Sequence, residues 1–247
     1  MANWNDPQPS RTGFGASPSL DGTSIGRATY DVGLRRHMLS IYNYMASGVL
    51  LSGIVALLFI YSGLAAQVMT TPLRWVIALA PLGFVFAMQF GIQKMKTSTL
   101  QLLFWLFSVA MGLSLSSLLF IYTGPSIATT FFATAAAFAG LSLVGYTTKR
   151  DLSAMGSFLI MGVFGILVAM IVNIFLQSTG LALAISVLGV LIFAGLTAYD
   201  TQRLKNEYQM VRGTDWAGKA VVMGALSLYL DFINMFTFLL QLIGDRR

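Results

Sequence analysis

The chain has 247 residues, of which 56% are hydrophobic and only 10% are charged, and its mean hydropathy is +0.76. A soluble domain has roughly 45 to 50% apolar and about 25% charged residues, so this composition excludes a single water-facing globular domain. The formal net charge of +6 lies mostly beside apolar runs, where attraction to anionic lipid headgroups explains it, and we expect no nucleic-acid partner.

The N-terminal segment is rich in Asn, Pro, Ser, Gly and Thr and has no apolar period. Such a segment buries too little apolar surface to fold by itself. We therefore predict a disordered cytoplasmic tail over residues 1–36 and a transmembrane domain over residues 37–247.

Apolar stretches of about twenty residues follow, each long enough to cross a hydrocarbon layer about 30 Å thick. They are apolar on all sides and lack the alternating polarity of a barrel strand. The sequence therefore predicts an all-α integral membrane protein with about seven transmembrane helices. The predicted spans cover residues 38–61, 73–93, 99–122, 126–147, 154–177, 181–201 and 220–243.

Lysine and arginine are concentrated at alternate ends of these spans. Basic loops remain cytoplasmic, so we place the chain in the inner or plasma membrane with its N-terminus in the cytoplasm. An odd number of spans then puts the C-terminus outside, but Arg246 and Arg247 at that end oppose this assignment, which stays open. The cytoplasmic basic residues are Arg27, Arg35, Arg36, Lys94, Lys96, Lys149, Arg150, Arg203, Lys205, Arg212 and Lys219.

Most of the usual catalytic patterns are missing from the sequence. The chain has no cysteine, and its single histidine, His37, is interpreted as a headgroup contact beside Arg35 and Arg36. There is no phosphate-binding glycine loop and no set of serine, histidine and carboxylate. We expect neither an enzyme nor a resident cofactor.

Small residues recur every four positions in two of the predicted spans. The first set is Gly83, Ala87 and Gly91, and the second is Ser108, Gly112 and Ser116. Small side chains on one helix face let neighbouring helices approach closely. We interpret both sets as packing surfaces.

Two aspartates, Asp200 and Asp231, lie inside the last two predicted spans. A carboxylate within a membrane helix costs a few kcal/mol even on lenient scales, so it normally has a partner, a polar cavity or a proton. Asp200 lies one turn from Arg203, and an interfacial ion pair between them is the simplest alternative interpretation. Asp231 has no basic residue within two turns.

The last predicted span carries a polar stripe that includes Asp231. Ser227, Asp231, Asn234 and Gln241 share one helical face, which is unsuited to contact with lipid. This span should therefore lie within the bundle. Residue counting places Asp231 deeper than Asp200, and the sequence does not establish contact between them.

A close pair of carboxylates has two chemical uses. In a site of low dielectric both groups do not ionise easily, so the pair acts as a proton switch. Carboxylate oxygens also suit Ca²⁺, which takes about six to eight oxygen ligands. Two aspartates make a weak site, better suited to passage than to storage.

Two segments resemble the paired C-terminal signatures of the Bax inhibitor family in a bacterial form. They read Gly-Leu-Thr-Ala-Tyr-Asp-Thr-Gln at 195–202 and Ala-Leu-Ser-Leu-Tyr-Leu-Asp-Phe-Ile-Asn at 225–234. The resemblance implies a central seventh helix surrounded by the other six. It also implies that Asp200 and Asp231 sense pH for a Ca²⁺ leak. From the polar stripe and from the spacing to Asp200, we take Ser227, Asn234 and Arg203 as supporting residues.

The resemblance further implies a basic residue near the cytoplasmic end of the second span that holds the closed state. This region offers Gln89, Gln93, Lys94 and Lys96 in place of a clear arginine, and Lys94 is the candidate. The family is also linked to suppression of cell death and, in bacteria, to modulation of a membrane protease.

Three functions remain open at this point. The first is a pH-sensitive Ca²⁺ leak channel or transporter, and the second is a regulatory protein that binds a membrane protease or another partner. The third is an intramembrane aspartyl protease. Tyr199 and Asp200 fit the first half of the protease pattern, but the second half needs Gly-x-Gly-Asp, and Leu-Tyr-Leu-Asp stands at 228–231.

Overall fold

The computed structural model describes the backbone of residues 22–247 and the side chains of residues 32–247. Its helices are α1 (Gly22–Tyr61), α2 (Leu64–Met69), α3 (Leu73–Gly91), α4 (Thr97–Ile121), α5 (Gly124–Thr147), α6 (Ser153–Leu176), α7 (Thr179–Val211) and α8 (Trp216–Ile243). Seven of them are long and apolar enough to cross a membrane, which confirms the predicted class and number of spans. The unexpected element is the short helix α2, which connects the first two spans after Gly63 adopts a positive φ of 75°.

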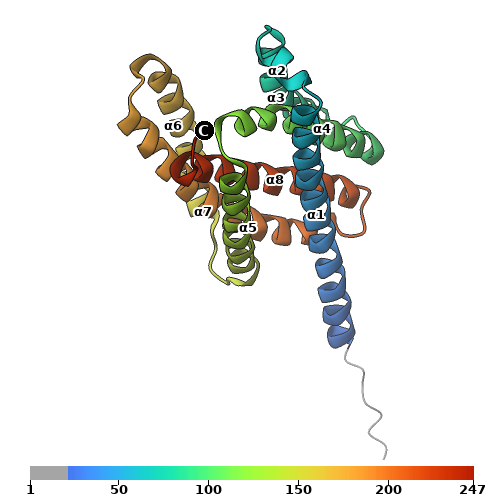
Figure 1. The fold of residues 1–247 in the computed structure, drawn as a ribbon. Coiled ribbons are helices and arrows are strands. Elements are labelled where there is room, and N and C mark those ends of the chain that lie inside the picture. The colour runs from blue at the N-terminus through green and yellow to red at the C-terminus, as the bar shows by residue number, and fades with distance from the viewer. Residues whose placement is uncertain (1–21) are drawn as a thin grey trace, which may run out of the picture.

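The spans form a bundle around α8, as Figure 1 shows. Of the seven spans, α8 has the largest buried share, and it packs mainly on α1, α4, α5 and α7. Two helices lie further out, with α3 packed on α4 and α6 packed on α7. The predicted central position of the last span is therefore correct, although its main neighbours are four helices and not six.

A buried hydrogen-bond network joins three helices at the centre of the bundle. The Tyr229 hydroxyl of α8 lies 2.6 Å from Ser52 Oγ of α1, and Ser52 Oγ donates to the carbonyl oxygen of Ser108 on α4 at 2.7 Å. The rings of Phe104 and Phe107 pack edge-on against Tyr229. In lipid such polar groups need internal partners, so this network fixes the relative positions of α1, α4 and α8.

The first helix begins earlier than predicted. Residues 22–36 were assigned to the disordered tail, yet they continue α1 without interruption, while residues 1–21 lie outside the described part of the chain. No proline breaks the helix here, and Leu34 and His37 are both buried. His37 stacks against Tyr208 of α7 with a centroid separation of 5.2 Å, so its interpretation as a headgroup contact is wrong.

The two sets of small residues behave differently. A Cβ at Gly112 would collide with the backbone of Ser52, so α4 approaches α1 closely at this residue. This confirms the packing surface that was predicted from Ser108, Gly112 and Ser116. A Cβ at Gly83 would meet no atom within 4 Å. The predicted packing surface on α3 is therefore wrong, because that face of α3 points out of the bundle.

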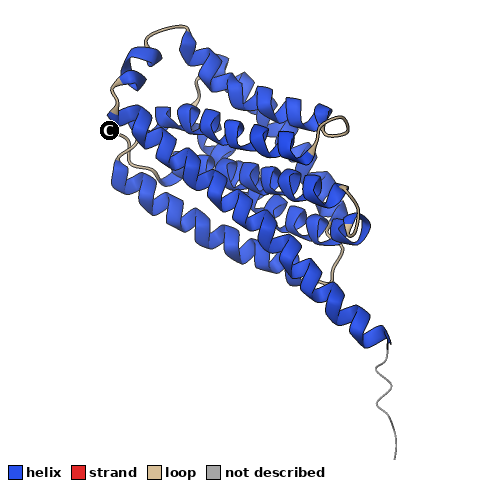
Figure 2. Cartoon of the chain, turned by 90° about the vertical axis from the view of Figure 1, so that its right-hand side faces the viewer, coloured by secondary structure: helices blue, strands red, loops and turns tan. Residues whose placement is uncertain are grey.

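The two ends of the described chain lie at opposite ends of the bundle, as expected for an odd number of spans (Figure 2). The C-terminal residues pair with the turn between α4 and α5. The Thr123 amide donates to the Asp245 carbonyl oxygen at 3.0 Å, and the Arg247 amide donates to the Ile121 carbonyl oxygen at 2.9 Å. The Arg246 guanidinium lies over the Tyr122 ring, 6.0 Å from its centroid.

Candidate functional site

The antiparallel helices α7 and α8 are in register, so that Asp200 and Asp231 stand at the same level. Seven residues outward from each aspartate, Phe193 and Phe238 stack with their ring centroids 5.9 Å apart. Seven residues are close to two helical turns, so the aspartates share the helix faces of these rings. The expectation that Asp231 lies deeper was wrong because α7 continues to Val211, well past the predicted end of that span.

Asp200 is held by two neighbours. Ser227 Oγ, which lies one turn before Asp231 on α8, donates to Asp200 Oδ2 at 2.7 Å. An Arg203 guanidinium nitrogen lies 3.3 Å from the same oxygen and donates to Ser227 Oγ at 3.0 Å. The side chain of Arg203 is 45% exposed, whereas that of Asp200 is 8% exposed. The predicted partners Ser227 and Arg203 are therefore both in place.

Asp231 is buried more completely and has fewer partners. Its residue exposure is 4%, and its Oδ2 has no hydrogen-bond partner among the described residues. The charges of Asp200 and Arg203 both lie within electrostatic range of it. An unpaired carboxylate oxygen in a membrane interior is costly, so this oxygen is suited to binding a proton or a cation.

A cavity of about 570 Å³ leads to Arg203 and Ser227, the two partners of Asp200, from the end of the bundle where α7 and α8 are joined. It opens between α3, α6, α7 and α8, and we call it the vestibule. Its polar lining residues include Gln89, Gln202, Arg203, Glu207 and Ser227. A charged solute inside the vestibule can therefore approach the exposed side chain of Arg203.

On the other side of the pair, the seam between α7 and α8 is closed by the stacked rings of Phe193 and Phe238, which are both buried. A second cavity of about 570 Å³ lies beyond them at the end of the bundle that holds the C-terminus. At its inner edge Ser186 Oγ donates to Gln241 Oε1 at 3.2 Å. The partners of Asp200 thus face the vestibule on one side of the aspartates, and an aromatic layer lies on the other side.

Two of the predicted supporting residues are not brought to the aspartates. Lys94 lies exposed in the turn after α3, and no hydrogen bond or ion pair of the described residues joins it to Asp200 or Asp231. Asn234 turns its amide to the carbonyl oxygen of Leu230 on its own helix, at 2.8 Å. Arg203 supplies the basic group beside the pair. Lys94, the residue predicted to hold the closed state, does not contact the aspartates in this structure.

Sequence analysis did not identify Glu207 or Gln202. Glu207 lies seven residues after Asp200 on the vestibule side of α7, and this spacing was missed because the predicted span ended at residue 201. Gln202 fixes the turn before α6, because its amide donates to the Arg150 carbonyl oxygen at 2.7 Å and accepts from the Leu152 amide at 2.9 Å. It therefore shapes the vestibule wall.

The exposed carboxylate of Asp151, two residues before Ser153 of the vestibule lining, is not suited to sensing neutral pH. The Ser153 hydroxyl and amide both donate to Asp151 Oδ1, at 2.6 and 2.9 Å, and these bonds hold the pKa of Asp151 below its usual value. Asp151 therefore stays ionised between about pH 5 and 8.

Comparisons with known proteins cover the same part of the chain. A family model described as inhibitor of apoptosis-promoting Bax1 matches residues 34–247. An uncharacterised protein of Caulobacter vibrioides is 50% identical over 230 residues, covering 88% of this chain and 91% of its own. The inner membrane protein YbhL of Escherichia coli is 43% identical over 219 residues, covering 87% and 94%. An uncharacterised membrane protein of Streptococcus pyogenes is 36% identical over 218 residues, covering 87% and 94%.

Proposed function

This chain belongs to the Bax inhibitor family of multi-pass membrane proteins, and from that premise we propose that it is a pH-sensitive Ca²⁺ leak pathway. In this proposal Asp200 and Asp231 form the site at which protons and Ca²⁺ compete. The membrane is the inner or plasma membrane, the location named for the Escherichia coli relative, and the N-terminus is cytoplasmic.

The observation that carries the proposal is the unpaired carboxylate oxygen of Asp231 beside a second buried carboxylate. Asp200 and Arg203 together are close to neutral, so an ionised Asp231 leaves the group with a net negative charge. That charge attracts a divalent cation, and a proton on either carboxylate removes it. Binding of Ca²⁺ should therefore strengthen as the pH rises.

Arg203 supplies the competing cation of the resting state. It reaches Asp200 and Ser227 together from the wall of the vestibule, and nearly half of its side chain is exposed there. A Ca²⁺ ion that enters the vestibule meets this guanidinium before it meets Asp231. Release of Arg203 from Asp200 is the step that lets the ion bind both carboxylates.

The aromatic layer explains why such a pathway is a slow leak in place of an open pore. The rings of Phe193 and Phe238 offer a Ca²⁺ ion no oxygen ligands in place of its water molecules. Passage therefore requires α7 and α8 to separate there. Two carboxylates give a weak site for Ca²⁺, which favours release over storage.

The decisive experiment is Ca²⁺ flux into proteoliposomes made from the purified chain. We expect flux with the wild-type chain and its loss when Asp200→Asn and Asp231→Asn are combined. Asp215→Asn is the matched control, because this exposed residue between α7 and α8 undergoes the same chemical change away from the pair. Absence of flux in the wild type, or equal flux in the double variant, overturns the proposal.

A regulatory binding function is the second candidate, and the description of the family model as an inhibitor of another protein favours it. In that case the chain acts on a membrane protease or another partner through a helix face, and the aspartates serve the fold. A chain that is monodisperse but inactive in the flux measurement supports this candidate.

A further inference from the structure

A groove separates α1 from α5, away from the vestibule. These two helices hardly touch, whereas both pack on α7 and α8. The groove has a volume of about 500 Å³, and its apolar walls are formed by Met38 and Leu39 on one side and by Phe138, Ala139 and Leu143 on the other. Positions 38 and 39 lie on one face of α1, and positions 138, 139 and 143 lie on one face of α5.

The two ends of the groove differ in polarity. Arg35 lies at the end nearest the start of α1, and Tyr146 lies at the same level near the end of α5. Lys205 of α7 fixes Tyr146 there, since its ammonium donates to the Tyr146 carbonyl oxygen at 2.7 Å and lies 5.3 Å from the ring centroid.

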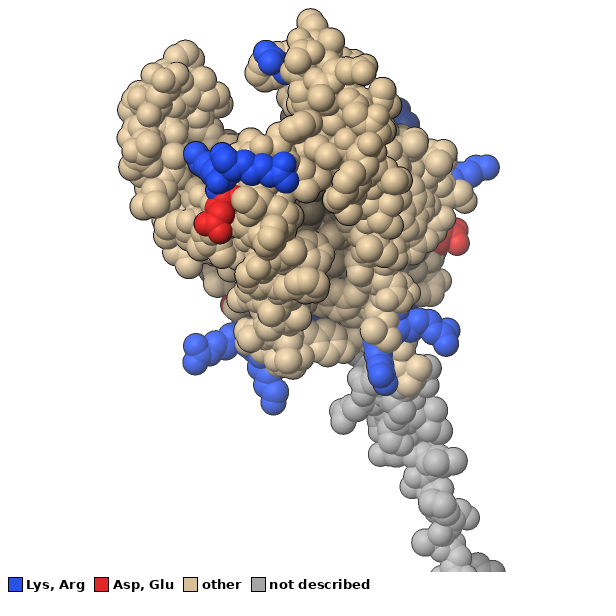
Figure 3. All heavy atoms as spheres, viewed as in Figure 1, with Lys and Arg blue, Asp and Glu red and all other residues tan. Residues whose placement is uncertain are grey.

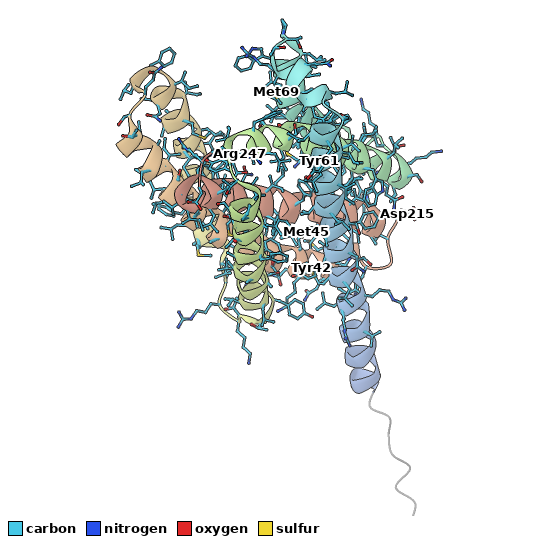
Figure 4. All side chains as sticks on the ribbon, viewed as in Figure 1. Tyr42, Met45, Tyr61, Met69, Asp215 and Arg247 are labelled. Carbon is cyan, nitrogen blue, oxygen red and sulfur yellow. The ribbon has the colours of Figure 1, made fainter. Side chains whose placement is uncertain are left out.

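A chain of hydrogen-bonded hydroxyl groups links the two walls of the groove. Tyr42 lies on the side of α1 that faces α5 (Figure 4), and its hydroxyl forms a hydrogen bond with Ser142 Oγ. Ser142 in turn lies 2.9 Å from the Thr201 hydroxyl of α7. The groove lining thus extends about 10 Å along α1, from Arg35 at the basic mouth to Tyr42, and the wall between them is apolar.

Basic side chains predominate around the mouth. Arg36, Lys149 and Arg150 are exposed near the same ends of α1 and α5, and Figure 3 shows Lys and Arg side chains gathered along this edge of the molecule. Among the residues whose side chains the structure describes, no acidic one lines the groove. The groove therefore matches a ligand with an anionic head and an apolar tail.

We propose that this groove binds one anionic phospholipid of the cytoplasmic leaflet, with its phosphate beside Arg35 and an acyl chain between α1 and α5. An acyl chain needs no hydrogen bonds, and the hydroxyls of Tyr42 and Ser142 are already paired. A peptide segment would bring backbone polar groups that find no partners there. The bound lipid fills the space that direct helix packing leaves, and this site is independent of the aspartate pair.

The test is native mass spectrometry of the full chain released from detergent after addition of phosphatidylglycerol or phosphatidylcholine with matched acyl chains. We expect the wild type to bind phosphatidylglycerol about fivefold more tightly, the effect of one basic residue at an anionic headgroup. Arg35→Gln should remove this preference. Ala139→Trp should fill the groove and lower the binding of both lipids, and Leu39→Trp tests the same point from the opposite wall.

Matched controls use the same changes elsewhere. Arg74→Gln removes a basic residue at the opposite end of the bundle, and Ala137→Trp enlarges a side chain on the opposite face of α5. Both should bind lipid as the wild type does. Equal affinity of the wild type for the two lipids overturns the proposal, as does unchanged binding in Arg35→Gln with both tryptophan variants. A dimer that the tryptophan variants abolish would show that a second copy of the chain occupies the groove.

Discussion

Asp200 and Asp231 stand at matching positions on α7 and α8, yet they are held differently. Asp200 accepts from Ser227 and pairs with Arg203, whereas Asp231 Oδ2 has no partner among the described residues. Asparagine at position 200 can still accept from Ser227, so that substitution removes charge while it keeps one contact. At position 231 it removes the charge that the proposed ion needs.

The charges of the two carboxylates interact, so we expect the effects of their substitution to be coupled. Asp200→Asn and Asp231→Asn should each change the pH dependence of Ca²⁺ leak, because each removes the like-charge repulsion felt by the other aspartate. The double variant should depart from the sum of the singles. Leak rates in proteoliposomes between about pH 5 and 8 measure both effects.

Strict additivity, or an unchanged pH profile in both single variants, would contradict a functional pair. Asp200 would then be an interfacial partner of Arg203, and the regulatory binding function would become the better explanation. Asp215→Asn serves again as the control, since it should leave the profile unchanged.

The residues of the site were mostly predictable, because a charged side chain inside an apolar run is conspicuous. Asp200, Asp231, Ser227 and Arg203 all lie where the stripe on α8 and the spacing on α7 indicated. The assignment of Lys94 failed because the position of a turn relative to another helix depends on how α3 packs. That packing leaves no mark in the local sequence.

Among the helices, the approach of α5 to α7 is unusually close. A Cβ at Gly145 would collide with the backbone carbonyl of Ala198, two residues before Asp200. The α7 side of this contact is backbone, which cannot rotate away as a flexible side chain can. This contact therefore supports the part of α7 that carries the site.

We expect Gly145→Ala to destabilise the protein by about 1 to 3 kcal/mol, the range for an overpacked interior. The thermal unfolding midpoint in detergent measures the effect. Gly140→Ala is the control on the same helix, because a Cβ there meets no atom within 4 Å and alanine is the better helix former. A midpoint for Gly145→Ala equal to that of Gly140→Ala would show that the helices adjust without cost.

Helix number and type were predictable because about twenty apolar residues leave few alternatives in lipid. Helix length was less so. α7 continues to Val211 and α1 begins at Gly22, so both helices extend past the apolar runs from which their spans were predicted. The ring of His37 against Tyr208 joins these two extensions.

At the scale of the whole molecule, seven spans place the two ends of the described chain on opposite sides of the membrane, but their number does not determine which end is cytoplasmic. The basic residues do bear on direction, because the turns after α3, α5 and α7 carry them. The central position of α8 was predictable from its polar stripe. The outer positions of α3 and α6 were not, since all the spans are similarly apolar.

We expect the vestibule to face the cytoplasm. The chain has no cysteine, so Asn206→Cys introduces a single thiol at an exposed position on the vestibule wall. A membrane-impermeant thiol reagent should label it only after the cells are opened. A cysteine at Ser62, exposed between α1 and α2 at the other end of the bundle, should react in intact cells. Labelling of Asn206→Cys in intact cells would reverse the assigned orientation.

The pairing of the last residues with the turn between α4 and α5 affects how the protein can be handled. The amide of Arg247 is already used by Ile121, so the backbone there is part of the fold and not a free end. An affinity tag or fluorescent reporter fused at this point starts at the rim of the second cavity and can disturb the hydrogen bonds between the last residues and the turn between α4 and α5. Fusions to the N-terminus leave that turn undisturbed and are the better choice for purification and imaging.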